Sequence, residues 1–350
     1  MYDKGLLTRS VHRISVVLSL LIVFFFVVSV NGAYARKPYK IKVLTPPAFM
    51  ATYAIGVGLA DVINKNSTWL KATVVEGKSP TENTKRVVAK KKLRKTVIWS
   101  ITEPTHYEAL SGFPIFKGIN YDFTRIKYVF PISVILNALI TLDPKIKTLA
   151  DLKGKRICVI NRPTRTAWSD MAFYCLEAAG VSRDDVKMEY MHYKPAHTAM
   201  MDGLLDVVGS GGAMMGPNKW VLSPFAVEVV DTRKTYFINW DAKVLERMYK
   251  ETGNPYYPLT IPANTFRNQV NPWVIAAKYY AWSVTDEMPD YVVEEILRVV
   301  WENLDKFGEY HPMGKFLSPK TMGIMGNTKF YHPLAVKILK EKGSPMGVLR

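Results

Sequence analysis

"YKIKVLTPPAFMATYAIGVGLADVINKN", residues 39–66, decides the fold class of this 350-residue chain. Residues 39–45 predict a strand, a Pro-Pro turn follows, and residues 51–66 predict a helix. A strand at 72–77, a basic helix from Thr81 to Arg94 and a strand at 96–102 continue this order. Strands that alternate with helices predict an α/β fold with a parallel sheet.

Parallel sheets of this kind bind ligands at the carboxyl ends of their strands. In the first unit these ends correspond to residues 46–53, 77–81 and 99–103. Unpaired amide groups and the helix dipole at such places attract a carboxylate or another anion. The competing interpretation of each loop is ordinary turn chemistry.

A second unit follows the extended stretch 125–142. It contains a strand at 156–160, then the loop and helix start "INRPTRTAWSD" (160–170), and a helix to Ala179 that Gly180 ends as a left-handed cap. Trp168, Met171, Ala172, Cys175, Leu176 and Ala179 form one apolar stripe on that helix. Strands at 186–191 and 205–210 come next, with a loop at 211–217.

A second extended stretch, 225–232, mirrors the first, and two crossings between two α/β units predict two lobes joined by a hinge. A cleft between such lobes can enclose a small ligand. The predicted domains are a leader at 1–35, the first part of lobe 1 at 36–130, an inserted lobe 2 at 131–230, and the completion of lobe 1 with C-terminal helices at 231–350.

The N-terminus has the form of a secretory signal peptide. Lys4, Arg9 and Arg13 precede the apolar run at 16–30, and the triplet Ala33-Tyr34-Ala35 predicts cleavage before Arg36. A retained membrane anchor is the alternative, because the run is only a little shorter than the roughly 20 residues that span a bilayer. Either outcome predicts a periplasmic or other extracytoplasmic location.

The charge of the chain favours anionic partners. Removal of residues 1–35 lowers the net charge from +17 to +15. The densest basic block, "KRVVAKKKLRK" (85–95), is interpreted as a solvated helix face rather than as a nucleic-acid site, because no recognition motif accompanies it. Cys158 and Cys175 form either a disulfide or two buried free thiols.

The sequence contains no motif of an enzyme, and no catalytic residue, metal ligand or cofactor is predicted. A Gly-x-Ser-x-Gly elbow and a phosphate-binding Gly-x-x-x-x-Gly-Lys-Ser/Thr loop are absent. "GVGLA" (56–60) lies inside a helix, where close packing explains its glycines better than a dinucleotide does. His192 and His197 have a poor spacing for zinc.

Several segments together resemble the TAXI family of solute-binding proteins, which serve TRAP transporters. They include "TLADLKGKRICVI" (148–160), "YAIGVGLADVINK" (53–65), "EGKSPTENTKRV" (76–87), "YPLTIPANTF" (257–266) and "YHPLAVKILKEKG" (331–343). The resemblance covers almost the whole chain after the leader. It implies a two-lobed, type II-like periplasmic-binding-protein fold without catalysis. Such a protein would capture an organic acid or amino acid and deliver it to a membrane permease.

Three candidate binding loops depart from the family pattern. Pro46–Thr52 replaces a Thr-Gly-rich turn, "GKSPTEN" (77–83) replaces a glycine-rich loop, and residues 165–168 replace Gly-Ser-Gly-Thr. These changes add bulk to the predicted pocket and put the common substrates of the family in doubt. The predicted ligand-binding residues are Tyr53, Ser79, Trp99 and Ser100 of the first lobe, with Arg165, Thr166, Ala167, Trp168 and Met214 of the second.

Arg165 is the predicted carboxylate clamp, because a guanidinium group matches a carboxylate bidentately. Its replacement by alanine should weaken binding by roughly 1.5–3 kcal/mol. Thr166 and the amides of Ala167 and Trp168 would add hydrogen-bond donors. The rings of Trp99 and Trp168 would cover apolar parts of the ligand. A role in the core is equally expected for Trp168. The alternatives are a binding protein for an ATP-driven importer, a ligand-sensing partner, and an exported enzyme on the same scaffold.

Overall fold

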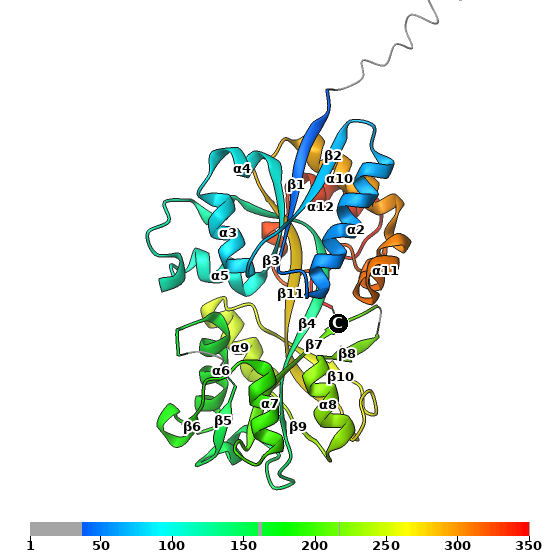
Figure 1. Cartoon of the computed structure of the whole chain (residues 1–350). Helices are drawn as coiled ribbons and strands as arrows, with labels where there is room; N and C mark the ends of the chain where they lie inside the picture. Colours follow the sequence, from blue (N-terminus) through cyan, green and yellow to red (C-terminus); the bar gives the residue numbers. More distant parts are fainter. Residues whose placement is uncertain (1–36, 160–162, 217, 350) are drawn as a thin grey trace, which may run out of the picture. The chain divides into compact units, whose positions relative to one another are not determined.

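A computed structural model describes residues 37–159, 163–216 and 218–349 of the chain (Figure 1). The predicted leader therefore lies outside the described residues, as do part of the loop at 160–162 and Pro217. Residues from Lys40 onward form one compact unit. Cys158 and Cys175 are buried and not joined by a disulfide, so the structure shows the interpretation as two buried thiols.

The described residues form one mixed sheet of eleven strands in the order β2-β1-β3-β11-β4-β7-β5-β6, with β8, β9 and β10 attached beside it. β1 and β3 are parallel, whereas β11 is antiparallel to both β3 and β4. The strands are β1 (Tyr39–Thr45), β2 (Leu70–Glu76), β3 (Val97–Thr102), β4 (Ile126–Thr141), β5 (Arg156–Cys158), β6 (Lys187–Met188), β7 (Val207–Met214), β8 (Trp220–Leu222), β9 (Tyr236–Ile238), β10 (Tyr257–Ile261) and β11 (Trp273–Thr285).

Helices alternate with these strands, which confirms the predicted α/β class. Those that precede β5 are α2 (Ala51–Asn66), α3 (Pro80–Val88), α4 (Lys91–Thr96) and α5 (Glu103–Leu110). Those that follow are α6 (Ala167–Ala178), α7 (Tyr193–Met201), α8 (Pro224–Thr232), α9 (Ala242–Thr252), α10 (Asp290–Glu302), α11 (Phe307–Tyr310) and α12 (Pro333–Glu341). Within the described ranges, none of these helices combines the length and the apolar character needed to cross a bilayer.

Two long strands, β4 and β11, connect two groups of elements (Figure 1). Tyr280–Ser283 of β11 pair with β3, whereas Trp273–Ala277 pair with β10. The partner of β11 therefore changes around Lys278. β4 and β11 remain paired to each other across this change, so they form a continuous two-stranded ladder between the groups. We name the elements β1–β3 with α2–α5 group 1, and β5–β10 with α6–α9 group 2.

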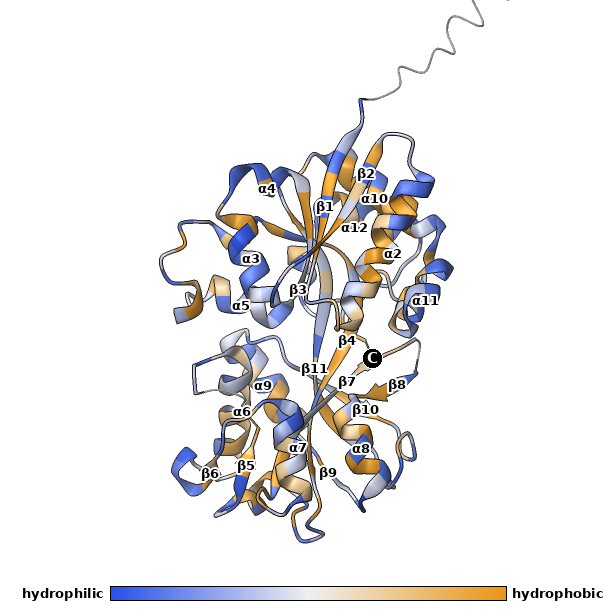
Figure 2. Ribbon diagram, in the orientation of Figure 1, coloured by the Kyte–Doolittle hydropathy of each residue, from blue (hydrophilic) through white to orange (hydrophobic). Residues whose placement is uncertain are grey.

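Local capping explains where several helices begin. Ser79 accepts a hydrogen bond from the amide of Glu82 at the start of α3, and Pro80 occupies the first turn, where its missing N–H costs nothing. The predicted helix 81–94 is divided into α3 and α4 around Lys90. α4 has no buried residue, which agrees with a solvated basic face (Figure 2).

Two of the predicted segments are wrong. Residues 225–232 are not an extended crossing but belong to α8, because Ser223 caps the helix through the amide of Ala226 and Pro224 fits its first turn. The long antiparallel neighbour of β4 is instead β11. Gly211–Met214 are not a loop, because this part of β7 pairs with β4 through Ala213 and with β8 through Met214.

The core of group 2 forms where α6 packs on the sheet. Met171, Ala172, Cys175 and Leu176 of the predicted apolar stripe are buried against β5 and β7. Gly180 follows the helix with φ of 76°, the left-handed conformation that glycine adopts at little cost. The stripe therefore fixes the rotation of α6, and it brings the first turn of the helix to the site described below.

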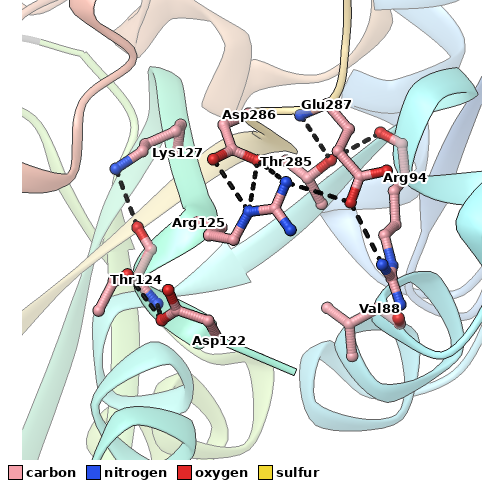
Figure 3. Close-up of polar contacts among 9 residues, drawn as sticks. All are labelled: Val88, Arg94, Asp122, Thr124, Arg125, Lys127, Thr285, Asp286 and Glu287. Carbon is pink, nitrogen blue, oxygen red and sulfur yellow. Dashed lines mark hydrogen bonds and ion pairs between the residues drawn. The ribbon is translucent and has the colours of Figure 1, made fainter. Parts of the chain in front are cut away.

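A polar network joins β4, β11 and the α3–α4 region (Figure 3). Glu287 accepts from Arg94 at 3.2 Å and from Arg125 at 3.3 Å, and Arg125 also contacts Asp286 at 2.9 Å. The hydroxyl of Thr285 donates to the carbonyl of Arg94 at 2.8 Å. Glu287 is the most enclosed of the charged side chains in the network, with 12% of its side chain exposed.

Candidate functional site

The four residues predicted from the first half of the chain do not form one surface. Trp99 and Ser100 are fully buried. The indole N–H of Trp99 donates to Thr84, and Ser100 accepts from the hydroxyl of Tyr280 at 3.1 Å. Ser79 is an exposed helix cap, and Tyr53 is half-buried in the first turn of α2. Trp99 is therefore positioned as a core residue of group 1.

The guanidinium of Arg165 is already paired with a carboxylate of the chain. It donates to Asp170 through Nε at 3.0 Å and through Nη2 at 2.8 Å, and it stacks on the ring of Phe113 at 4.4 Å. Its side chain is 62% exposed. Arg165 therefore has a fixed position near the start of α6, but Asp170 compensates its charge.

Thr166 begins α6 as its N-cap. Its hydroxyl accepts from the amide of Ser169 at 3.0 Å, and the Ser169 hydroxyl in turn accepts from the Thr166 amide at 2.8 Å. This reciprocal pair satisfies two backbone donors at the helix start. The Thr166 hydroxyl is thus engaged in stabilising the helix.

The next amide of the helix start is held by a carboxylate from group 1. Ala167 donates to Oε1 of Glu108 at 2.8 Å, and this hydrogen bond is buried. On the other side of the residue, the carbonyl of Ala167 accepts from the side-chain amide of Asn254 at 2.8 Å. The amide of Ala167, predicted to bind the solute, is therefore occupied by Glu108 in this structure.

Trp168 and Met214 both lie in packed surroundings. Trp168 is half-buried, meets Trp240 edge-on and Tyr256 at a tilt, and donates its indole N–H to the carbonyl of Val159 at 2.5 Å. Met214 is 1% exposed, and its carbonyl accepts from the hydroxyl of Ser133. Trp168 still lies beside the site through its contact with Tyr256.

Lys278 was not among the predicted residues, although it lies where β11 changes its strand partner. It is half-buried, and its ammonium nitrogen is 5.9 Å from the ring centre of Tyr256. Burial lowers the pKa of Lys278 to about 8, and the nearby charge of Glu108 acts in the opposite direction. Within the described parts of the chain, no hydrogen bond or ion pair satisfies this ammonium group. In the sequence, Lys278 could have been found as the single lysine in the otherwise apolar run "WVIAAKYYAW" (273–282).

Tyr256 connects Lys278 with the start of α6. It is 2% exposed and contacts the ring of Trp168. Burial raises the pKa of Tyr256 well above its usual range, and the neighbouring charge of Glu108 adds to this effect. The phenol is therefore a neutral hydrogen-bonding group at neutral pH. The site consists of Lys278, Tyr256, Glu108, Ala167 and Trp168.

A separate cavity of about 350 Å³ is lined by α5, the end of α9 and residues 327–330. None of the predicted ligand-binding residues lines it. At its base Glu103 is 2% exposed and accepts from the amide of Asn327 at 2.7 Å. Burial raises the pKa of Glu103 to about 8. No group of His, Cys, Asp and Glu side chains suited to a metal ion occurs among residues 37–159, 163–216 and 218–349.

Solved structures of solute-binding proteins resemble this chain at low identity. The aliphatic sulphonate binding protein SsuA from Escherichia coli is 14% identical, with 88% of this chain and 76% of that chain covered and a TM-score of 0.45. A TctC solute binding protein from Polaromonas is 14% identical, with 78% and 87% covered and a TM-score of 0.49. MatC from Rhodopseudomonas palustris, solved with malate, is 12% identical, with 87% and 97% covered and a TM-score of 0.47.

A family model matches most of the chain. It describes the NMT1-like family and aligns with residues 43–343, from within β1 to the second residue after α12. The match includes both groups of elements, the β4–β11 ladder and every residue of the site around Lys278. The chain belongs to the NMT1-like family.

Proposed function

We propose that this protein is an exported solute-binding protein that captures a small anionic solute and delivers it to a membrane permease. Groups 1 and 2 would be its two lobes, and the solute would bind beside the β4–β11 ladder. The TAXI resemblance supports a TRAP-type permease and a carboxylate as the anionic group. Residues 1–35 contain a basic start, an apolar run and an Ala-x-Ala triplet in that order, which supports export with cleavage before Arg36.

Lys278 is the observation that carries this proposal. A cation that leaves water is costly, and the lowered pKa of Lys278 is one expression of that cost, which the nearby charge of Glu108 offsets only in part. A bound carboxylate would add to the effect of Glu108 and accept hydrogen bonds from the ammonium group. Tyr256 and Trp168 would provide a neutral donor and an apolar wall next to it.

Lys278, rather than Arg165, is the proposed clamp for the carboxylate. Asp170 already compensates the charge of Arg165, and a solute would have to compete with that ion pair in solvent. Lys278 makes no direct ion pair in the described residues, although the charge of Glu108 acts on it. It lies between the two groups, where one solute could contact both.

The test begins with native mass spectrometry of freshly purified protein, which would identify a co-purified acid. Calorimetry with that acid should show at least tenfold weaker binding to Lys278→Ala, because about 1.4 kcal/mol or more is expected from a charge-assisted contact. Arg165→Ala should lose less than threefold. Lys243→Ala, which changes an exposed lysine on α9, is the matched control.

Unchanged affinity in Lys278→Ala would overturn the assignment of the clamp. A strong loss in Arg165→Ala alone would return that role to Arg165. We propose no chemical step, so the solute should be recovered unaltered after prolonged incubation, and a changed product would favour an exported enzyme instead.

A further inference from the structure

Helix α4 lacks the features that normally stabilise a helix. It has no buried residue, no side-chain cap and no acidic residue in its first turn. That turn instead contains Lys91 and Lys92, whose charges oppose the positive end of the helix dipole. Lys91 and Lys95 are also like charges four residues apart, a spacing that destabilises a helix. The stability of the fold therefore does not explain the composition of α4.

Two lysines of β1 lie on the side of the sheet that faces α3. The indole of Trp99 points toward α3, because its N–H donates to Thr84. Trp99 is paired in register with Leu44, and paired residues of neighbouring strands project to the same side of a sheet. Alternation along β1 then places Lys42 and Lys40 on this side as well. Both lysines are exposed, whereas Leu44 is buried.

α4 and the start of β1 meet at one end of the parallel strands (Figure 1). Lys42 is paired with Val97, the first residue of β3, and α4 ends at the residue before Val97. Arg94 fastens α4 to α3 by donating to the carbonyl of Val88 at 2.7 Å. A helix of six residues is only about 9 Å long, so its lysines stay at this end of the sheet. We define the lysine surface as Lys40, Lys42, Lys90, Lys91 and Lys92, all of them exposed.

The lysine surface has no ion-pair partner in the part of the chain that the structure describes. The carboxylates beside it are paired with other cations. Glu287 pairs with Arg94 and Arg125, and Glu82 of α3 pairs with Lys85. Figure 2 shows α4 as a hydrophilic helix. The like charges of the surface repel one another, and an anionic partner would relieve that repulsion.

The residue type of the surface favours a lipid membrane as this partner. A lysine is a hydrated point charge on a flexible chain, whereas recognition of one defined anion uses the bidentate geometry of arginine. Anionic headgroups attract lysines without a fixed geometry, and neighbouring lysines add to one another. The proposed export places the apolar run at 16–30 in a bilayer. Residues 31–40 span at most about 35 Å, so Lys40 would stay near that bilayer until cleavage.

We infer that the lysine surface binds the anionic headgroups of a lipid membrane and thereby holds the exported protein beside its permease. This inference takes only the export of the chain from the proposed function. It does not depend on a solute at Lys278. The surface acts by charge alone, so its binding should weaken as salt screens that charge.

Vesicle sedimentation of the full purified chain tests this inference. One set of vesicles is pure phosphatidylcholine, and the other contains about 30% phosphatidylglycerol in phosphatidylcholine. The wild type should bind the anionic vesicles at least about tenfold more tightly than the neutral ones. About 1 M salt, where the Debye length is roughly 3 Å, should abolish the difference. An attached leader is common to the wild type and every variant, so their comparison isolates the lysine surface.

The α4 variant, Lys90→Gln/Lys91→Gln/Lys92→Gln, should reduce the preference for anionic vesicles about tenfold or more. It should fold normally, because α4 has no buried residue. Lys40→Gln/Lys42→Gln changes the same surface from a different element and should also reduce the preference.

A matched control removes the same number of charges from exposed lysines of group 2. Lys187→Gln/Lys194→Gln/Lys243→Gln lowers the net charge as much as the α4 variant does and should bind vesicles as the wild type does. Equal losses in the control and the α4 variant would overturn the inference, because the overall charge would then explain the binding.

Equal wild-type affinity for both kinds of vesicle would also overturn the inference, as would an unchanged preference in both lysine-surface variants. Binding only to vesicles that contain the permease would assign the surface to an acidic protein face instead of lipid. Solute affinity, measured by calorimetry, should be the same in the wild type and the α4 variant. Failure of solute binding and failure of membrane binding are therefore seen in separate measurements.

Discussion

Glu103 shows what complete burial does to one carboxyl group. It occupies the first turn of α5 beside the amide of Asn327, and burial raises its pKa to about 8. The folded protein therefore holds a proton on Glu103 at neutral pH, whereas the unfolded chain has released it. This difference makes stability depend on pH between the ordinary value of 4.5 and about 8.

We expect Glu103→Gln to remove this dependence. In the wild type, the free energy of unfolding should fall by roughly 4 kcal/mol as pH rises from 4.5 to 8. The reason is that Glu103 keeps its proton in the folded state over this range, whereas it has released the proton in the unfolded chain. Below pH 4.5 both states are protonated, and the effect vanishes. Urea unfolding at pH 5, 6, 7 and 8 measures it, with exposed Glu177→Gln as the control. If the free energy of unfolding depended on pH in the same way in the wild type and in Glu103→Gln, this account would be contradicted.

At the residue scale, the sequence does not reveal which polar groups already have partners within the fold. The amide of Ala167 does bind a carboxylate, but only the fold brings Glu108 to it from 59 residues away. Trp99 and Ser100 are neighbours in the chain, and both are fully buried because β3 is a central strand between β1 and β11. The alternation of apolar and polar residues along a strand cannot reveal that other elements cover both faces of the strand.

The polar network around Glu287 connects β4, β11 and the α3–α4 region (Figure 3). Glu287→Ala removes the acceptor of both Arg94 and Arg125 and leaves their charges partly enclosed. We expect a loss of about 2 kcal/mol in the free energy of unfolding, less than for a fully buried pair because Arg125 is 38% exposed.

Chemical denaturation of Glu287→Ala should be compared with Glu302→Ala. Glu302 pairs with Arg298 on the surface of α10, and its loss should cost at most about 0.5 kcal/mol. Equal losses in the two variants would show that the Glu287 network contributes no more than a surface ion pair.

Elements with strong local signals were predicted well. β1 and α2 have the predicted bounds, and Gly180 follows α6 as expected. The segment 225–232 was misassigned because its valines favour a strand, and the cap from Ser223 and the proline that follows it outweigh that preference. β11 was missed as the second crossing because its partners are distant in the chain.

For the whole molecule, the pKa of Lys278 predicts how solute binding depends on pH. Affinity for the co-purified acid should be constant below about pH 7. It should then fall up to tenfold per pH unit above about 8, as the free protein loses the ammonium charge. Tyr256 does not interfere, because burial raises its pKa well above its usual range.

Calorimetry between pH 6 and 10 checks this expectation. Lys278→Arg is the matched control, because its guanidinium stays charged over that range, and its profile should be flat. The same decline in both proteins would mean that another group controls the pH dependence.

The central position of β11 has a consequence for the time at which the protein can fold. β3 and β4 are not neighbours, since β11 lies between them. A nascent chain that has emerged only as far as α9 therefore lacks the strand that joins the beginning of the sheet to the rest. Closing this gap requires contacts over more than 170 residues, from Trp99 to Ser283, which slows folding. The export that we propose would benefit from such a delay, because the late strand would keep the chain unfolded until synthesis is nearly complete.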